Sequence, residues 1–197
     1  YPGKIIVLQK DKVIEVSTEI MKLHSPYEDI GATFVDANSD GLPDLYVASG
    51  GGGEISDSNL LKDRLYINTG QGLFKYAKNG LPEILSSTKS VTPIDIDNDN
   101  DMDLFVAGRN VPGKYPQKAA SYLLENDNGF YKNITNSNLS GQLANMITDV
   151  TAEDVDGDGY TDLMMVGEWS TPQVFINDKN KSFNKREDAN LDKLTGW

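Results

Sequence analysis

The sequence contains no cysteine and a single histidine, His24. Disulfide bonds and thiolate metal sites are therefore excluded, and a Ser-His-Asp triad has only one histidine from which it could be built. A lone histidine is more often structural than catalytic. No run approaches the 18 apolar residues that a membrane-spanning helix needs. Residues 1–12 lack the basic flank and long apolar run of a signal peptide, so none is expected there.

Basic residues are also scarce. The chain has 18 lysines and arginines against 30 acidic residues, which gives a formal net charge of −12. Phosphate binding needs a basic face, so nucleic acid is not an expected partner. The length of 197 residues fits one good-sized domain or part of a larger protein.

Much of the negative charge lies in three segments that share one pattern. They read DANSDGLPDL from Asp36, DIDNDNDMDL from Asp95 and DVDGDGYTDL from Asp154, and their starts are 59 residues apart both times. Acidic or amide residues occupy positions 1, 3, 5 and 9 of each segment, with Gly or Asn at position 6. Three copies at one period indicate a structural repeat rather than an acid-rich composition.

The spacing suits a calcium ion. Ca²⁺ takes about six to eight oxygen ligands in flexible geometry, whereas Mg²⁺ demands a strict octahedron and retains its waters. Oxygens at alternate positions can surround one ion if the chain turns sharply at position 6. Gly41, Asn100 and Gly159 stand there, and both residue types tolerate a left-handed backbone. The pattern therefore predicts three Ca²⁺ sites, with three solvated acidic turns without metal as the alternative.

Each predicted site uses the side chains at positions 1, 3, 5 and 9 and the backbone carbonyl at position 7. The predicted ligands are Asp36, Asn38, Asp40, Leu42 and Asp44; Asp95, Asp97, Asp99, Asp101 and Asp103; and Asp154, Asp156, Asp158, Tyr160 and Asp162. An EF-hand would need Glu at position 12 and helices on both sides. Position 12 is Val47, Val106 and Met165, and the flanks are rich in β-formers, so EF-hands are excluded.

Short strand-like runs surround each loop. Strands are expected at 5–9 and 12–16, on both sides of each loop, and in hairpins at 64–68 with 73–77, 121–126 with 129–134 and 172–177 with 182–185. A connector is expected at 17–30, and an irregular, flexible loop from Gly50 to Asp63. The runs LYV, LFV and LMM after the loops fit a second strand buried on both faces. Asn68, Asn126 and Asn177 end the third strands and are expected to cap the hairpin turns.

Four short strands repeated every 59 residues predict an all-β fold of propeller blades, each a four-stranded antiparallel meander. The expected divisions are 1–28, two strands of a preceding blade and a connector; 29–87, with loop 36–44; 88–146, with loop 95–103; and 147–197, with loop 154–162. One blade cannot bury both faces of its sheet, and a closed ring needs about four to eight blades. We therefore expect a partial or open propeller whose remaining blades come from the parent chain or another chain.

The pattern DxDxDGxxDL between two strands, followed by LYxN, a turn and Phe, resembles the FG-GAP and VCBS-type repeats. These occur in integrin alpha subunits and in many secreted or cell-surface bacterial proteins. Residues 65–82, LYINTGQGLFKYAKNGLP, are most similar to the bacterial form. The resemblance covers nearly the whole chain and implies a calcium-stabilised β-propeller with ligation at the positions given above. Asn38 replaces an Asp, which weakens the first site, and Asn100 replaces a Gly in the second.

The family has no single activity, so the fold does not settle the function. The leading hypothesis is a noncatalytic extracellular module that binds a protein or glycan or mediates adhesion. The alternative is the propeller part of a secreted carbohydrate-active enzyme such as a polysaccharide lyase, with Tyr115, Trp169 and Trp197 as candidate sugar-stacking residues. Loops of this size bind Ca²⁺ usefully where the ion is abundant, so a secreted, periplasmic or cell-surface location is expected. The triplets at 133–135 and 138–140 match glycosylation acceptors, which are common and carry little weight.

Overall fold

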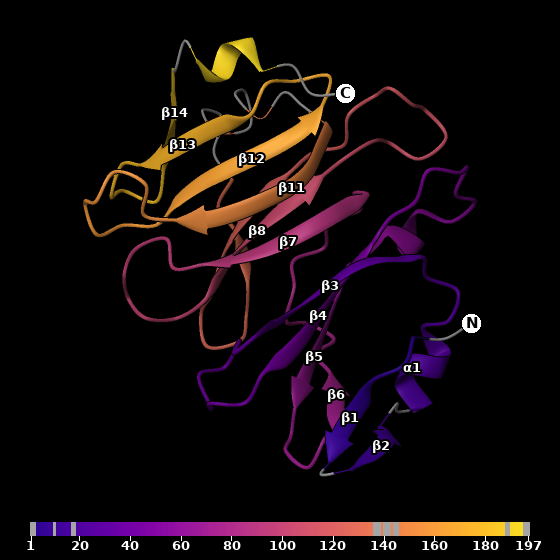
Figure 1. Cartoon of the computed structure of the whole chain (residues 1–197). Coiled ribbons are helices and arrows are strands. Elements are labelled where there is room, and N and C mark those ends of the chain that lie inside the picture. Colours follow the sequence, from indigo (N-terminus) through magenta and orange to yellow (C-terminus); the bar gives the residue numbers. More distant parts are fainter. Residues whose placement is uncertain are drawn as a thin grey trace.

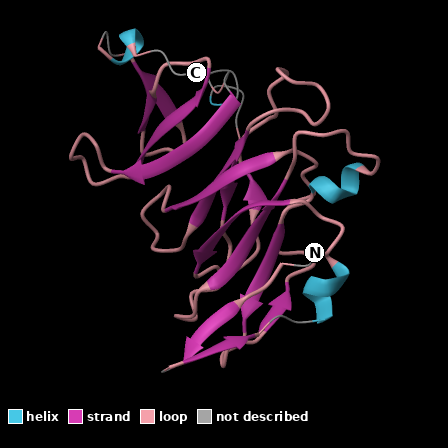
Figure 2. Ribbon diagram, turned by 45° about the vertical axis from the view of Figure 1, so that its right-hand side comes forward, coloured by secondary structure: helices cyan, strands magenta, loops and turns pink. Residues whose placement is uncertain are grey.

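A computed structural model describes residues 3–9, 11–16, 19–135, 139, 143, 146–187 and 190–194. This part of the chain is all-β, with short helices at its margins (Figures 1 and 2). The strands are β1 (Ile6–Gln9), β2 (Lys12–Glu15), β3 (Asp29–Val35), β4 (Asp44–Ser49), β5 (Arg64–Asn68), β6 (Phe74–Tyr76), β7 (Thr88–Ile94), β8 (Asp103–Gly108), β9 (Tyr122–Glu125), β10 (Lys132–Asn133), β11 (Met146–Glu153), β12 (Asp162–Glu168), β13 (Gln173–Asn177) and β14 (Phe183–Arg186). The helices are α1 (Glu19–Leu23) and two 3-10 turns, η1 (Ser58–Leu61) and η2 (Leu191–Lys193).

Within the described residues the strands form three four-stranded antiparallel sheets and the two-stranded β1–β2 hairpin. The sheets contain β3 to β6, β7 to β10 and β11 to β14, and neighbours in the chain are neighbours in each sheet, as in a meander. The first strand of each sheet shifts register at an equivalent point, between residues 29 and 31, 88 and 90, and 147 and 149. The 59-residue period of the sequence is therefore a period of the structure as well.

The three sheets stack face to face, and β7 lies between β3 and β11 (Figure 1). Tyr46 and Leu104 belong to the buried cluster between the first and second sheets. Phe105, Leu163 and Phe175 belong to the cluster between the second and third. Each sheet thus buries against its neighbour a face that it cannot bury alone, which is the architecture of consecutive blades of a partial or open propeller.

The N-terminal segment covers the outer face of the first sheet. Met21 of α1 is buried in one cluster with Leu45, Val47 and Tyr66. The connector predicted over 17–30 therefore contains a helix that the sequence analysis did not expect. Isolated helices this short are unstable, so α1 depends on its packing against the sheet rather than on a local signal in the sequence.

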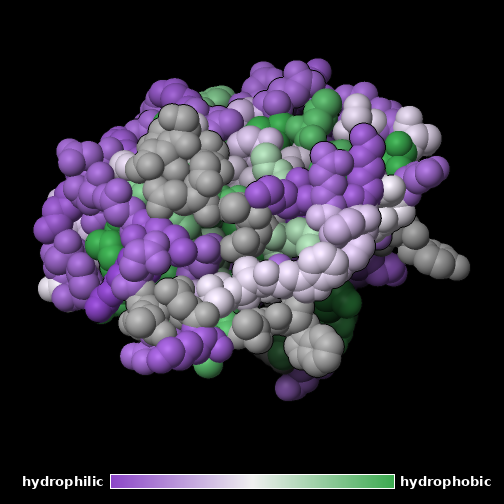
Figure 3. Space-filling view, turned by 90° about the horizontal axis from the view of Figure 1, so that it is seen from above, coloured by the Kyte–Doolittle hydropathy of each residue, from purple (hydrophilic) through white to green (hydrophobic). Residues whose placement is uncertain are grey.

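The outer face of the third sheet is different. Both faces of β4 and β8 are buried along their whole length. On β12, however, Met164 is 39% exposed and Val166 46%, whereas the equivalent Tyr46 and Phe105 are 1% and 0% exposed. The prediction that LMM is buried on both faces is therefore wrong for this strand, because no further sheet covers it within the described chain. Seen from above, hydrophobic residues show between hydrophilic ones on this side (Figure 3).

Two smaller predictions also need correction. The hairpin strand expected over 129–134 is reduced to the two residues of β10. The loop from Gly50 to Asp63, expected to be irregular, contains η1, whose N-cap Asp57 accepts a hydrogen bond from the Asn59 amide at 2.9 Å. Among the described helices, none has the length and apolar composition required to cross a membrane.

Candidate metal centres

The three acidic loops lie at one end of the stacked sheets, where each joins the first strand of its sheet to the second (Figure 1). The strands run antiparallel, so the β5–β6, β9–β10 and β13–β14 hairpin turns lie at the same end. Each acidic loop is therefore close to the hairpin turn of its own sheet, and the first two loops, because the sheets are stacked, are also close to that of the following sheet.

The backbone bends alike in all three loops. At position 6, φ is +81° for Gly41, +72° for Asn100 and +87° for Gly159. The left-handed turn expected there is thus present in each copy. A second left-handed residue stands at position 4, which the sequence analysis did not identify: φ is +56° for Ser39, +60° for Asn98 and +78° for Gly157. Asn98 and Gly157 are residue types that tolerate a left-handed backbone, so the sequence did contain a signal for this second turn.

The carboxylate at position 1 organises each loop by accepting backbone N–H groups. In the third loop, one oxygen of Asp154 accepts from Gly157 at 2.8 Å and from Asp158 at 3.2 Å, and the other accepts from Gly159 at 2.9 Å. Asp36 and Asp95 each accept the amides of positions 5 and 6 in the same way. These bonds, that of Gly159 foremost, lower the pKa of Asp154, so its carboxylate stays charged.

The side chains at position 5 repeat as well. One oxygen of Asp40, Asp99 and Asp158 accepts the amide of position 7 at 2.8, 2.9 and 2.9 Å. These amides belong to Leu42, Asp101 and Tyr160, whose carbonyls were predicted as ligands. In the first loop, the Asn38 side-chain amide also donates to Asp40 at 3.0 Å. The backbone of each loop thus curls around the side chains of positions 1 and 5.

The Asp at position 9 is buried in every loop and opens the second strand of its sheet. One oxygen of Asp103 accepts the Ile96 amide at 3.0 Å, and the other accepts the Asn126 amide at 2.7 Å. Asp44 and Asp162 accept from the equivalent residues, Ala37 with Asn68 and Val155 with Asn177. This residue therefore ties its loop to the end of the third strand. Each oxygen keeps a second lone pair, and in the third loop Asp162 lies within 4.8 Å of ligand oxygens of Asp154 and Asp156.

Carboxylate oxygens converge in two of the loops. Ligand oxygens of Asp95, Asp97 and Asp99 lie within 4.8 Å of one another, and so do those of Asp154, Asp156 and Asp162. Crowding of this kind is electrostatically unfavourable without a cation. Burial, followed by the charges of Asp103 and Asp99, raises the pKa of Asp101 to about 7. Burial likewise raises the pKa of Asp103 to about 6, against the two amides that it accepts.

The donor set fits a hard divalent cation. The predicted ligands offer only carboxylate, amide and backbone carbonyl oxygens, with no imidazole or thiolate. Oxygen-only ligation is the preference of Ca²⁺ and Mg²⁺ rather than of zinc or copper. Each loop also has the tight turns needed to present alternate residues to one point. The first loop has Asn38 at position 3 and so has one carboxylate fewer than the others.

The first and second loops are each also bonded to the following sheet. Asn126 donates its side-chain amide to the Ala37 carbonyl at 2.8 Å, and Asn177 donates to the Ile96 carbonyl at 2.8 Å. Both carbonyls belong to position 2 of the preceding loop. The side-chain oxygens of Asn68, Asn126 and Asn177 accept amides in their own hairpin turns, as the sequence analysis expected. The additional bond across sheets was not anticipated, since nothing local in the sequence specifies it.

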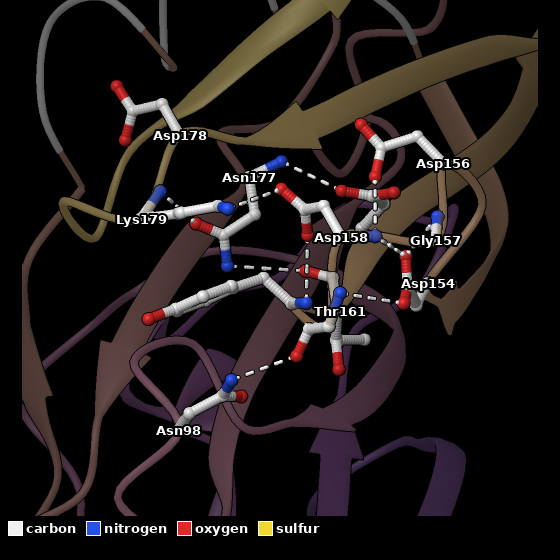
Figure 4. A network of polar contacts seen from close by, with 12 residues as sticks. Asn98, Asp154, Asp156, Gly157, Asp158, Thr161, Asn177, Asp178 and Lys179 are labelled. Carbon is white, nitrogen blue, oxygen red and sulfur yellow. Dashed lines mark hydrogen bonds and ion pairs between the residues drawn. The ribbon is translucent and has the colours of Figure 1, made fainter.

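Further polar and charged contacts join the second and third sheets, and one more lies within the third sheet. Asn98 of the second loop donates to the Gly159 carbonyl of the third at 2.8 Å (Figure 4). Lys181, in the β13–β14 turn, contacts Asp97 of the second loop at 2.5 Å and also pairs with Glu125. Lys179 pairs with Asp158 of the third loop at 3.1 Å (Figure 4). Two predicted ligands, at position 3 of the second loop and position 5 of the third, therefore pair with lysines.

The other candidates from the sequence lie elsewhere. His24 Nδ1 is hydrogen-bonded to the Tyr66 hydroxyl at 2.6 Å and is surrounded by aromatic rings, which fits a structural role. Burial lowers its pKa. Tyr115 and Trp169 are brought into contact at the opposite end of the sheets from the acidic loops. Trp197 and the triplet at 138–140 lie outside the fully described residues.

Comparison with known families supports the assignment of a structural repeat to this chain. Residues 36–106 match a family described as FG-GAP-like repeat. The match begins at the first residue of the first loop and ends in β8, so it spans the first two loops and the hairpin between them. No curated protein matches the chain. This segment is therefore similar to a noncatalytic structural module of the β-propeller type, which is typical of extracellular proteins.

Proposed function

We propose that this chain is a noncatalytic module of FG-GAP/VCBS-type blades, similar to the bacterial form, in which Ca²⁺ binds to each of three loops. The observation that carries the proposal is the repetition of one loop architecture three times. Each copy has the same two left-handed residues and the same set of bonds from positions 1, 5 and 9. Acidic turns that serve only solubility would have no reason to share this geometry.

The ligands are those at positions 1, 3, 5, 7 and 9, from Asp36, Asp95 and Asp154 onward. Calcium suits these loops better than magnesium because the donors come from a flexible run of alternate residues rather than a preformed octahedron. Burial first, and then the charges of neighbouring carboxylates, raises the pKa of Asp101 and Asp103, and a bound ion would offset the repulsion among those carboxylates. The second and third sites, with four ligand carboxylates each, should bind more tightly than the first, with three.

The proposed role of the ion is structural. Asp44, Asp103 and Asp162 bond to the ends of the third strands, and Asn126 and Asn177 bond the loops to the next sheet. A metal that rigidifies a loop therefore also stabilises the boundary between blades. Such a module would present the loops at the other end of its blades to a protein or glycan, or mediate adhesion. Calcium is abundant outside the cytoplasm, so a secreted, periplasmic or cell-surface location follows.

We also propose that further blades, from the parent chain or another chain, complete the propeller. Met164 and Val166 of β12 occupy the positions that Tyr46 with Ala48, and Phe105 with Ala107, fill in the first two sheets. In those sheets these positions are packed in the clusters shared with the following sheet. The apolar outer face of the third sheet therefore has the composition of a surface that receives a fourth.

Calorimetric titration of the metal-free chain with CaCl₂ tests the proposal. We expect three sites for Ca²⁺ and much weaker binding of Mg²⁺. Asp97→Ala or Asp156→Ala should remove one site, since each deletes a converging carboxylate. Asn38→Ala should retain three sites, because it deletes only a neutral oxygen. No binding at millimolar Ca²⁺, or a stoichiometry that neither Asp variant changes, would show that the loops are not calcium sites.

A further inference from the structure

Two exposed aromatic side chains from neighbouring sheets meet at the end opposite the acidic loops. Tyr115 lies in the connection after β8, and Trp169 directly follows β12. Their rings are in edge-to-face contact, with centroids 5.8 Å apart and planes at 77°. Trp169 is 67% exposed and Tyr115 53% exposed. Since β8 and β12 begin at the acidic loops, their far ends place this pair on the opposite side of the module.

The conformation and the exposure of Trp169 are both unfavourable. Its φ of +55° is in the left-handed region, where a bulky side chain is a rare outlier. Its indole also remains largely in water instead of contributing to a core. The packing explanation, which usually accounts for aromatic residues near loops, therefore does not apply to this tryptophan. Strained residues of this kind concentrate at ligand-binding sites.

An ion pair lies beside the rings and fixes one of them. Arg109 Nε donates to Glu168 Oε1 at 2.5 Å, and a second guanidinium nitrogen contacts the same oxygen. The Tyr115 hydroxyl donates to Glu168 Oε2 at 3.1 Å. Arg109 and Tyr115 come from the second sheet's connection and Glu168 from the end of β12, so these bonds join two blades. Flat apolar rings thus stand next to a hydrogen-bonding carboxylate and guanidinium.

This combination matches the chemistry of a sugar. A pyranose ring has an apolar face of C–H groups and an edge of hydroxyls, so it stacks on an aromatic ring while its hydroxyls bond to charged side chains. An anionic ligand is disfavoured by Glu168 and by the net charge of −12. A peptide would be expected to use a strand edge, a groove or an aromatic-lined cleft. The site offers instead an isolated ring pair with polar groups beside it.

We propose that Tyr115, Trp169, Arg109 and Glu168 form a binding site for a neutral hexose unit of a glycan. This inference rests on the proposed function: it names a glycan as the ligand of the loops at the end of the module opposite the acidic loops. Trp169 supplies the stacking surface, and Tyr115 supports the indole through the edge-to-face contact of the two rings. Glu168 and Arg109 bond the sugar hydroxyls. The site spans two blades, so it depends on the stacking of the second and third sheets.

Fluorescence titration of the full chain tests this assignment. In a Trp197→Phe background Trp169 is the single tryptophan, since the chain has two. The probes are neutral hexaoses of glucose, mannose and galactose in their common linkages. We expect a saturable change of emission with at least one probe, with a dissociation constant on the order of 1 mM or tighter. Calorimetry confirms binding by the Trp197→Phe chain, and it can also measure binding by variants that lack Trp169.

Substitutions separate stacking from general effects. Trp169→Ala should weaken binding at least tenfold by calorimetry, whereas Trp169→Phe should keep part of it. Phe130→Ala is the matched control: this ring is 60% exposed in the β9–β10 turn, at the acidic-loop end, and its loss should leave the affinity unchanged. Circular dichroism melts confirm that each variant is folded.

The outcomes are separable from those of the calcium titration. If the chain binds three Ca²⁺ but none of the oligosaccharides, the sugar site is wrong and the calcium proposal stands. If oligosaccharides bind while Ca²⁺ does not, the calcium proposal fails alone. Binding that is insensitive to Trp169→Ala, or a response only to choline or to a proline-rich peptide, would overturn the assignment.

Discussion

Position 6 of each acidic loop is constrained by its backbone and not by its surroundings. An added Cβ at Gly159 would meet nothing within 4 Å, yet φ there is +87°. This explains how Asn100 can stand at the equivalent place in the second loop with φ of +72°. The side chain has room, and the cost is only that of a left-handed conformation, which Asn tolerates better than most residues.

Replacement of this glycine provides a test of the backbone argument. Gly159→Ala should lower the free energy of unfolding by about 1 kcal/mol, the usual cost of a left-handed non-glycine residue. Gly52→Ala is the matched control, because Gly52 also has an open surrounding but no positive φ. Urea unfolding at fixed Ca²⁺ measures both. Equal effects at the two positions would contradict the assignment of strain to position 6.

Asp63 is a half-buried residue outside the loops, and the sequence analysis gave it no role. Its oxygens accept from the Ser49 amide at 2.7 Å, the Tyr46 hydroxyl at 2.6 Å and the Thr88 hydroxyl at 2.7 Å. Thr88 begins the second sheet, so Asp63 joins two blades. Burial raises its pKa to about 6, although these three hydrogen bonds and the charge of Arg64 oppose the rise.

This shift predicts a pH dependence of stability. The folded-state pKa of Asp63 is above the unfolded value of about 3.9, so its stabilising contribution is complete below about pH 4. That contribution is lost as the pH rises through about 6. The Asp63→Asn variant has no carboxyl to ionise, so it should not lose this contribution. The free energy of unfolding of the variant minus that of the parent should therefore rise by about 2–3 kcal/mol between pH 4 and pH 7. Urea unfolding of both proteins across this range measures it. Parallel profiles would show that Asp63 does not titrate there.

At the scale of the element, the ends of β9 and β13 are the points where the second and third sheets bond to the preceding loop. Asn126 is buried, bonds to Ala37 of the preceding loop and accepts the Gly129 amide of its own turn. Asn68 is equivalent, but its side-chain amide donates to Pro43 of its own sheet at 3.1 Å, in an exposed position. The same residue type therefore has a different partner in each context.

Asn126→Ala should accordingly be more harmful than Asn68→Ala. The first change leaves two buried backbone groups without partners, at about 1–3 kcal/mol each. After Asn68→Ala, water can bond to the backbone groups that lose their partner. The decrease in the free energy of unfolding should therefore be well below that of Asn126→Ala. Urea unfolding at saturating Ca²⁺ compares them. Losses of similar size would mean that the bond between blades contributes little.

Lys181 places a positive charge beside a predicted ligand of the second loop, and its contacts with Asp97 and Glu125 raise its pKa. A calcium ion in that loop would be repelled by this ammonium group. At a separation of about 5 Å in an aqueous dielectric, the repulsion is roughly 1.5 kcal/mol. Lys181→Met should therefore tighten Ca²⁺ binding at the second site about tenfold.

The measurement uses a chain that carries Asp40→Ala and Asp156→Ala, so that the second loop is the one intact site. Lys132→Met is the control, because it removes one lysine whose salt bridge is to Asp127, outside the loops. Its affinity should remain close to that of the parent. If Lys181→Met binds Ca²⁺ equally or more weakly, the lysine supports the site and does not oppose it.

At the scale of the whole molecule, the loops and the boundaries between blades form one connected system. Three loops hold carboxylates that repel one another, and each boundary depends on bonds to those loops. Ligand binding to the native state alone adds about 2.7 kcal/mol per site at a hundredfold excess over the dissociation constant. Three sites would then contribute an amount comparable with the roughly 5–15 kcal/mol stability of a whole domain.

Chelation should therefore lower the melting temperature markedly. Added Ca²⁺ should restore it, and equal Mg²⁺ should restore it only weakly. Thermal melts followed by circular dichroism, on protein whose metal content has been measured, provide the test. A melting temperature that chelator leaves unchanged, on protein shown to be metal-free, would mean that the loops have no structural calcium.

The sequence by itself determined the features that depend on residues near one another in the chain. The loop pattern specified the left-handed residue at position 6, and the 59-residue period specified three equivalent meanders. These follow because backbone conformation and hairpin pairing are set by a few neighbouring residues. For the same reason, Asn68, Asn126 and Asn177 could be recognised as turn caps.

Only the tertiary structure decided which blades meet and through which residues. Asn126 and Ala37 are 89 positions apart, and Arg109 and Glu168 are 59 apart. Nothing in the sequence near Trp169 indicates that Tyr115 will be its neighbour, and nothing near Asp63 indicates that it will accept a hydrogen bond from Thr88. Such contacts depend on how the sheets twist and stack, and stacking is driven by the nondirectional burial of apolar faces. That force brings the blades together, and the shape of the packed faces then sets which polar groups lie opposite one another.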